Sequence, residues 1–312
     1  MKQILSLFLL STAICLCQTS SAQGPFEFKA TFIKKDVAPA KTIVVLANDV
    51  DPNLEKANAW LEEAVRKFWT ATRPEFTSKK LSEVKTGTGE AIFIAITSGY
   101  TQDLINRKAS DKSPAPVYKD GEFGWKITFL YRDKKGNLVS DVSTPYTTLY
   151  HGFDQLDVIT SVRILNSYFD EVIRGVDDKK MRALANGIPP LYYKLTANHK
   201  TELKSKTLLI DKDMLAKKTT EEDLKGSYTG KLKIASREEI LGYVQSGSKD
   251  YAYTFSIGVE DGSSMSGSLI LDTKNGHVLS YAKNSSMVVN TSRFDPVKVD
   301  KKTVKAYEDN LK

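Results

Sequence analysis

The chain has 312 residues, of which 41% are hydrophobic, and a formal net charge of +7 at pH 7. This hydrophobic content is enough to fill ordinary globular cores, so the composition excludes a wholly disordered chain. The 45 basic residues are mixed with 38 acidic ones and form no long lysine or arginine block, which argues against a nucleic-acid-binding protein.

The first 22 residues have the pattern of a secretory signal peptide. A lysine at position 2 precedes an almost entirely apolar run over residues 4–16, and small residues at Ser20 and Ala22 favour cleavage before Gln23. The apolar run is shorter than the ~20 residues that a membrane span needs. We therefore expect a protein without a transmembrane segment that is exported through a bacterial inner membrane and is periplasmic or secreted. The Ser-Ala-Gln end of the signal and the lysine-rich body resemble secreted proteins of the Bacteroidetes.

Both cysteines, Cys15 and Cys17, lie inside the predicted signal peptide. Cleavage would therefore remove disulfides, thiolate metal sites, cysteine nucleophiles and CxxC redox chemistry together. The chain has three histidines, His151, His199 and His277, and no HxxxH pairing, so the local spacing does not predict a histidine zinc site. We interpret His151 and His277 as turn or cap residues and place His199 in a linker.

The first half of the remaining chain predicts alternating strands and helices. A β-branched run and an apolar stripe at helical spacing begin it, and a strand–turn–strand pattern and a long amphipathic helix end it. In chain order we expect a strand at 41–46, a helix at 53–68, a second helix at 78–84, a strand at 91–96, a hairpin at 127–140 and a helix at 154–174.

The second half repeats this order of motifs. We expect a strand at 206–210, a short capped turn at 219–224, a helix at 236–245, a strand at 252–257, a hairpin at 267–280 and a charged helix at 301–311. The two hairpin sequences align without a gap, so that Gly136 meets Gly276, and a glycine there supplies the positive φ that a tight turn needs. The repeat predicts two related small α/β (or α+β) domains.

The element order within each unit loosely resembles the thioredoxin-like topology, although the CxxC redox motif of that family is absent. The resemblance concerns element order and implies no redox function. The predicted organisation is a signal peptide at 1–22, an N-terminal segment at 23–40, a first domain at 41–185, a linker at 186–205, a second domain at 206–290 and a C-terminal tail with a short helix at 291–312.

The acidic loop after the first strand is the best candidate metal site. Asp49, Asp51 and Asn53 follow a predicted strand directly, and α/β sheets bind ligands at the carboxyl ends of their strands. Their oxygen atoms would suit Mg²⁺ or Ca²⁺. The strand-Asp-x-Asp order resembles the nucleophile motif of haloacid-dehalogenase-like phosphatases, but Pro52 departs from that motif. The alternative interpretation is a loop in which Asp51 caps the following helix.

Two classes of function remain. We favour a non-enzymatic binding or scaffold protein of the envelope, with a protein or glycan partner and no catalytic or cofactor-binding residues. The insertion at 100–123, which the second copy lacks, would be a natural binding loop. The alternative is a metal-assisted hydrolase or phosphatase that uses the acidic loop after the first strand.

Overall fold

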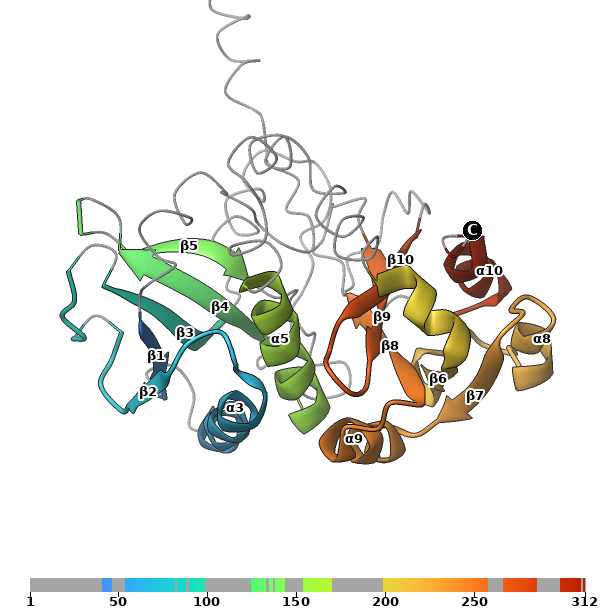
Figure 1. The fold of residues 1–312 in the computed structure, drawn as a ribbon, viewed down its shortest axis with the longest axis horizontal. Helices are drawn as coiled ribbons and strands as arrows, with labels where there is room; N and C mark the ends of the chain where they lie inside the picture. The colour runs from blue at the N-terminus through green and yellow to red at the C-terminus, as the bar shows by residue number, and fades with distance from the viewer. Residues whose placement is uncertain are drawn as a thin grey trace, which may run out of the picture.

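The described residues form an α/β structure with two five-stranded mixed sheets. Figure 1 shows the arrangement of these strands and helices in the computed structural model. The structure describes residues 41–46, 54–98, 125–143, 154–169, 199–257, 266–284 and 298–311, apart from positions 82, 88, 89, 133, 134, 137 and 310. The predicted signal peptide, the segment 23–40 and the insertion at 100–123 lie outside these residues. Of the described helices, none is long and apolar enough to cross a membrane.

The first sheet has the strand order β2-β1-β3-β4-β5. Strand β1 (Lys41–Val45) lies between β2 (Pro74–Thr77) and β3 (Ala91–Ser98) and runs parallel to both. The strands β4 (Trp125–Arg132) and β5 (Leu138–Ser143) continue the sheet in antiparallel fashion. Helix α3 (Leu54–Phe68) follows β1, as the apolar stripe predicted.

The predicted helix at 78–84 is wrong. Strand β2, in which Phe76 lies opposite Val44 of β1, ends at Thr77 just before this segment, and the described residues of 78–84 run in turns and irregular structure towards β3. The two apolar residues of this segment, Leu81 and Val84, pack against the face of the sheet that carries Ile43. The packing of this segment on the sheet therefore outweighs its weak local helical preference.

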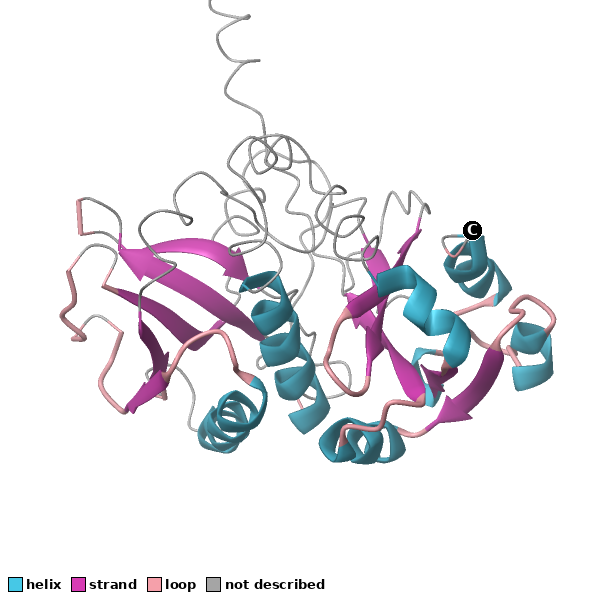
Figure 2. Cartoon of the chain, viewed as in Figure 1, coloured by secondary structure: helices cyan, strands magenta, loops and turns pink. Residues whose placement is uncertain are grey.

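The second sheet has the order β10-β9-β8-β6-β7. Here β6 (Thr207–Asp211) runs parallel to β7 (Lys231–Ala235) and β8 (Tyr251–Ile257), and β9 (Ser266–Asp272) and β10 (Val278–Asn284) are antiparallel. The connecting helices are α8 (Glu221–Lys225) and α9 (Arg237–Ser246), and the chain ends in α10 (Lys301–Asp309). In the first half α3 stands between β1 and β2, and in the second half α8 precedes β7 and α9 precedes β8, so helices and strands are mixed in both halves (Figure 2).

The strands of the two sheets correspond in order and relative direction. In each, the first strand of the half lies between the next two strands and runs parallel to both, and an antiparallel hairpin completes the sheet. The hairpin glycines that the sequence aligns also share a left-handed backbone, with φ of 79° at Gly136 and 77° at Gly276. The positive φ predicted for both turns is thus confirmed.

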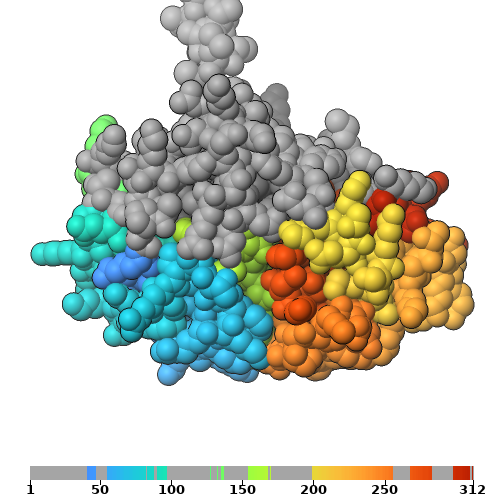
Figure 3. Space-filling view, in the orientation of Figure 1, coloured from blue at the N-terminus to red at the C-terminus, as the bar shows by residue number. Residues whose placement is uncertain are grey.

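Helix α5 (Gln155–Tyr168) lies between the two sheets (Figure 1). It packs against α3 on one side, and its buried side chains join a single apolar core with residues of both sheets, among them Val44, Ile92, Leu209 and Leu271. The space-filling view shows the two halves in direct contact (Figure 3). One hydrogen bond between the halves joins α3 to α9, because the Lys67 ammonium donates to the Gln245 carbonyl at 2.8 Å. The described parts of the two halves therefore form one packed body.

The second sheet is covered on its other face as well. Leu208, Ile210 and Leu279 pack there with Val304 and Tyr307 of α10. A 3-10 helix, η2 (Lys200–Ser205), adds Leu203 to the same cluster, although it falls within the predicted linker. Burial on both faces explains why β6 reads as a nearly continuous apolar run.

Candidate metal centre

The acidic loop predicted as a metal site lies outside the described residues. Strand β1 ends at Val45, helix α3 begins at Leu54, and Asp49, Asp51 and Asn53 lie between them. The prediction required that the loop follow the carboxyl end of a parallel strand. Strand β1 meets this requirement, because it lies between β2 and β3 and runs parallel to both. The site itself stays a prediction.

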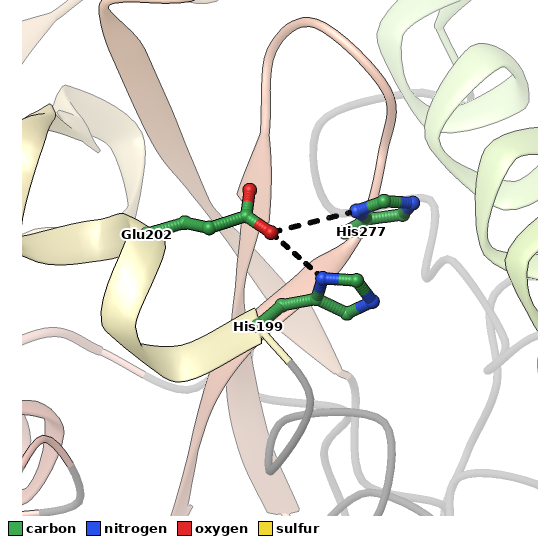
Figure 4. Close-up of side chains that lie close together, drawn as sticks. All are labelled: His199, Glu202 and His277. Atoms are coloured by element: carbon green, nitrogen blue, oxygen red, sulfur yellow. Dashed lines mark hydrogen bonds and ion pairs between the residues drawn. The ribbon is translucent and has the colours of Figure 1, made fainter.

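A different group of metal-ligating side chains is brought together in the second half. His199, Glu202 and His277 each offer a ligand atom, and these three atoms lie within 4.8 Å of one another. In Figure 4, dashed lines join the Nδ1 atoms of both imidazoles to the same carboxylate oxygen of Glu202. Among the described residues this is the one group of three histidine, cysteine or acidic side chains that meets this criterion.

Local structure explains how η2 presents two of these side chains. His199 is the residue that precedes the 3-10 helix, and Glu202 follows three positions later. Side chains at i and i+3 are eclipsed along a 3-10 helix, so the imidazole and the carboxylate lie on the same side of it. Leu203, which is fully buried in the core of the second half, anchors the helix between them.

The hairpin between β9 and β10 supplies the third side chain. The His277 amide donates to the Asn275 side-chain oxygen at 3.0 Å, and the His277 carbonyl accepts from the Asp272 amide at 3.0 Å. These bonds and the left-handed backbone of Gly276 fix the turn, so the position of His277 depends on the hairpin. The interpretation of His277 as a turn residue did not anticipate its contact with η2.

The three groups are close but not arranged as around an ion. His199 Nδ1 lies 2.7 Å from Glu202 Oε1, a hydrogen-bond distance, whereas His277 Nδ1 lies 4.0 Å from the same oxygen. The two imidazole rings are stacked, with centroids 3.8 Å apart and an interplanar angle of 27°. The side chains of His199, Glu202 and His277 are 17%, 37% and 30% exposed, so solvent reaches the cluster.

A second charged cluster joins the two halves at the N-terminus of α5. The Arg237 guanidinium donates to both carboxylate oxygens of Asp154 at 2.6 and 2.9 Å, to Asp157 at 2.8 Å and to Asp211 at 2.8 Å. Asp154 and Asp157 form the capping box of α5, whereas Arg237 begins α9 and Asp211 ends β6. One cation thus binds three carboxylates, two from α5 across the boundary between the halves and one from its own half.

The charge imbalance of this cluster has an electrostatic consequence. Burial and the neighbouring Asp154 carboxylate raise the pKa of Asp157 to about 7, although Arg237 opposes the shift. Burial also disfavours ionised Asp154, but its hydrogen bonds and attraction to Arg237 outweigh burial and hold its pKa below the usual value. The cluster is therefore expected to hold a proton on Asp157 below neutral pH.

Further buried polar contacts tie α5 to the second sheet. The Arg163 guanidinium, which is 1% exposed, donates to the Asp272 carbonyl at 3.0 Å and to the Thr273 carbonyl at 2.9 Å. The hydroxyls of Thr160 and Tyr253 lie 2.9 Å apart. The Arg163 bonds reach the hairpin that carries His277, so the candidate centre rests on a turn that α5 holds in place.

Sequence reasoning missed the candidate centre because its parts are distant in the chain. His199 and His277 lie 78 positions apart, and an absent HxxxH motif says nothing about such a pair. The one local signal is the i, i+3 spacing of His199 and Glu202, which appears only once the segment is known to be helical. His151, the remaining histidine, lies outside the described residues.

Comparisons of the chain with protein-family models, with curated protein sequences and with solved structures found no match.

Proposed function

We propose that the chain is an exported, non-enzymatic binding or scaffold protein of the bacterial envelope, in which two copies of one α/β unit are fixed to each other. The matching strand order of the two sheets supports the duplication, together with the gap-free alignment of the two hairpins. The loosely thioredoxin-like element order stays a prediction within this proposal. The partner classes that fit such a surface in the envelope are a protein or a glycan.

The observation that carries the proposal is the position of α5. By sequence this helix closes the first unit, yet its polar side chains bond to the second sheet through Thr160, Arg163 and Ser167. Helix α5 also contributes Asp154 as N-cap and Asp157 to the cluster around Arg237. A fixed pair of units presents one continuous surface to a partner, which is the physical property of a scaffold.

Unfolding with two probes tests whether the units are fixed. All three tryptophans, Trp60, Trp69 and Trp125, lie in the first half, so their fluorescence follows that half, whereas far-UV circular dichroism follows both. Urea unfolding of residues 23–312 should give coincident transitions by the two probes. A fluorescence transition clearly separated from the dichroism transition would mean independent domains and would refute the fixed scaffold.

Cell fractionation tests export separately. The full chain should appear in the periplasm or the medium of a Bacteroidetes host as a species that begins at Gln23. Cytoplasmic protein that retains residues 1–22 would contradict the proposal.

A further inference from the structure

We propose that His199, Glu202 and His277 form a binding site for a divalent transition-metal ion of the zinc type. Two imidazoles and one carboxylate are a ligand set that such ions accept, with a further coordination position left for water or a ligand. Mg²⁺ and Ca²⁺ prefer oxygen ligands only, so this site differs in metal preference from the predicted acidic loop. The proposal is independent of the scaffold function.

The distances place the three ligand atoms within reach of one ion. Bonds of about 2.0–2.2 Å to a metal put neighbouring ligand atoms roughly 3–3.6 Å apart. The separation of 2.7 Å between His199 Nδ1 and Glu202 Oε1 must therefore open slightly, and the separation of 4.0 Å from His277 Nδ1 must close slightly. Shifts of this size need no movement of the backbone.

The stacked rings determine what else must change. The lone pair of an imidazole nitrogen lies in the plane of its ring, so two stacked rings direct their lone pairs side by side rather than at one point. An ion would therefore rotate His199 or His277 out of the stack that Figure 4 shows. The χ2 torsion of histidine is broad, and both side chains are partly exposed, so this rotation has room.

The supporting elements keep the ligands near one another before an ion arrives. Helix η2 is anchored by buried Leu203, and the hairpin is fixed by the turn bonds of Asp272 and Asn275. A metal ion would thus join η2 to the hairpin and stabilise the folded form in which both ligand-bearing segments are in place.

Calorimetric titration of metal-free residues 23–312, made without a histidine tag, with Zn²⁺ is the direct test. We expect saturable binding of one ion per chain. His277→Gln and Glu202→Gln should each weaken it at least tenfold, because even partners outside the ligand shell typically account for tenfold changes. The matched control is His151→Gln, which removes the third histidine and should change the dissociation constant less than twofold. No saturable binding, or binding that neither ligand variant weakens, would overturn the proposal.

Imidazole NMR of the unmutated protein provides a second test that does not depend on the folding of variants. The chain has three histidines, so three sets of ring signals are expected. Zn²⁺ should shift the signals of His199 and His277 with a one-to-one endpoint and leave those of His151 in place. A shift of His151 alone, or no shift at one equivalent, would reject the site.

Discussion

Replacement of Arg237 by methionine should cost about 3–5 kcal/mol of unfolding free energy at pH 7, the range for removing one partner of a buried ion pair. The arginine side chain is 17% exposed and bonds to three carboxylates, of which the Asp211 side chain is 2% exposed. Methionine keeps much of the side-chain volume but leaves the three acids without a cation. Because proteins of this kind are stable by about 5–15 kcal/mol, the loss is a large fraction of the total.

Urea unfolding of residues 23–312 measures this loss, with Arg66→Met as the matched control. Arg66 pairs with Glu62 on α3 at 2.6 Å, but the two side chains are 60% and 37% exposed, so its loss should cost about 1 kcal/mol or less. Arg237→Met should also separate the fluorescence transition from the dichroism transition, because the cluster joins the halves. If the two variants lost similar stability, the reasoning about the buried cluster would be refuted.

The pH dependence separates lost charge from lost packing. Without Arg237, nothing would oppose the burial that raises the pKa of Asp157, and Asp154 would lose the attraction that holds its pKa below the usual value. The folded variant would then bind more protons than its unfolded form, so its stability would fall as the pH rises. The deficit relative to the unmutated protein should be larger at pH 8 than at pH 5, whereas a deficit of equal size at both would indicate a packing defect.

Three further predictions follow from particular residues. Since burial raises the pKa of Asp157 to about 7, the stability that its proton contributes is fully present below about pH 4 and declines as the pH rises towards 7. Asp157→Asn should reduce this dependence of stability on pH in urea midpoints measured from pH 4.5 to 8. An unchanged pH dependence would contradict the prediction. Gly136→Ala should lower the unfolding free energy by about 1–2 kcal/mol through its left-handed backbone alone. Gly276→Ala should lower it by at least ~1 kcal/mol more, because the new Cβ would lie 2.7 Å from Arg163 side-chain atoms. Equal unfolding free energies for the two variants would disprove the close contact. In the loop 49–53, saturating Mg²⁺ or Ca²⁺ at ~100 times the dissociation constant should stabilise the protein by ~2.7 kcal/mol, and alanine at both aspartates should abolish the shift in thermal unfolding; no shift with either ion would remove that site.

The sequence predicted those elements whose cause is local. The hairpin glycines Gly136 and Gly276 are examples, because a tight turn needs their positive φ whatever surrounds it. Ser236 is another, since its side chain caps α9 by accepting from the Glu239 amide at 3.2 Å. The helix expected at 78–84 was wrong because the surroundings of this segment, not its own residues, decide its conformation. The segment connects β2 to β3, which both run parallel to β1, and its Leu81 and Val84 side chains pack on the sheet.

The Arg237 cluster and the candidate metal centre could not be predicted in this way, because each is assembled from segments far apart in the chain. The cluster around Arg237 uses α5, β6 and α9, and the candidate centre uses η2 and a hairpin. The two sheets share their strand order, whereas the contacts between the two halves have no counterpart within either half. Arg237 illustrates this, since the carboxylates of Asp154 and Asp157 that it binds come from the other half. Residues that differ between the two aligned hairpin sequences, such as His277 opposite Asn137, are therefore the better guide to what the two halves do together.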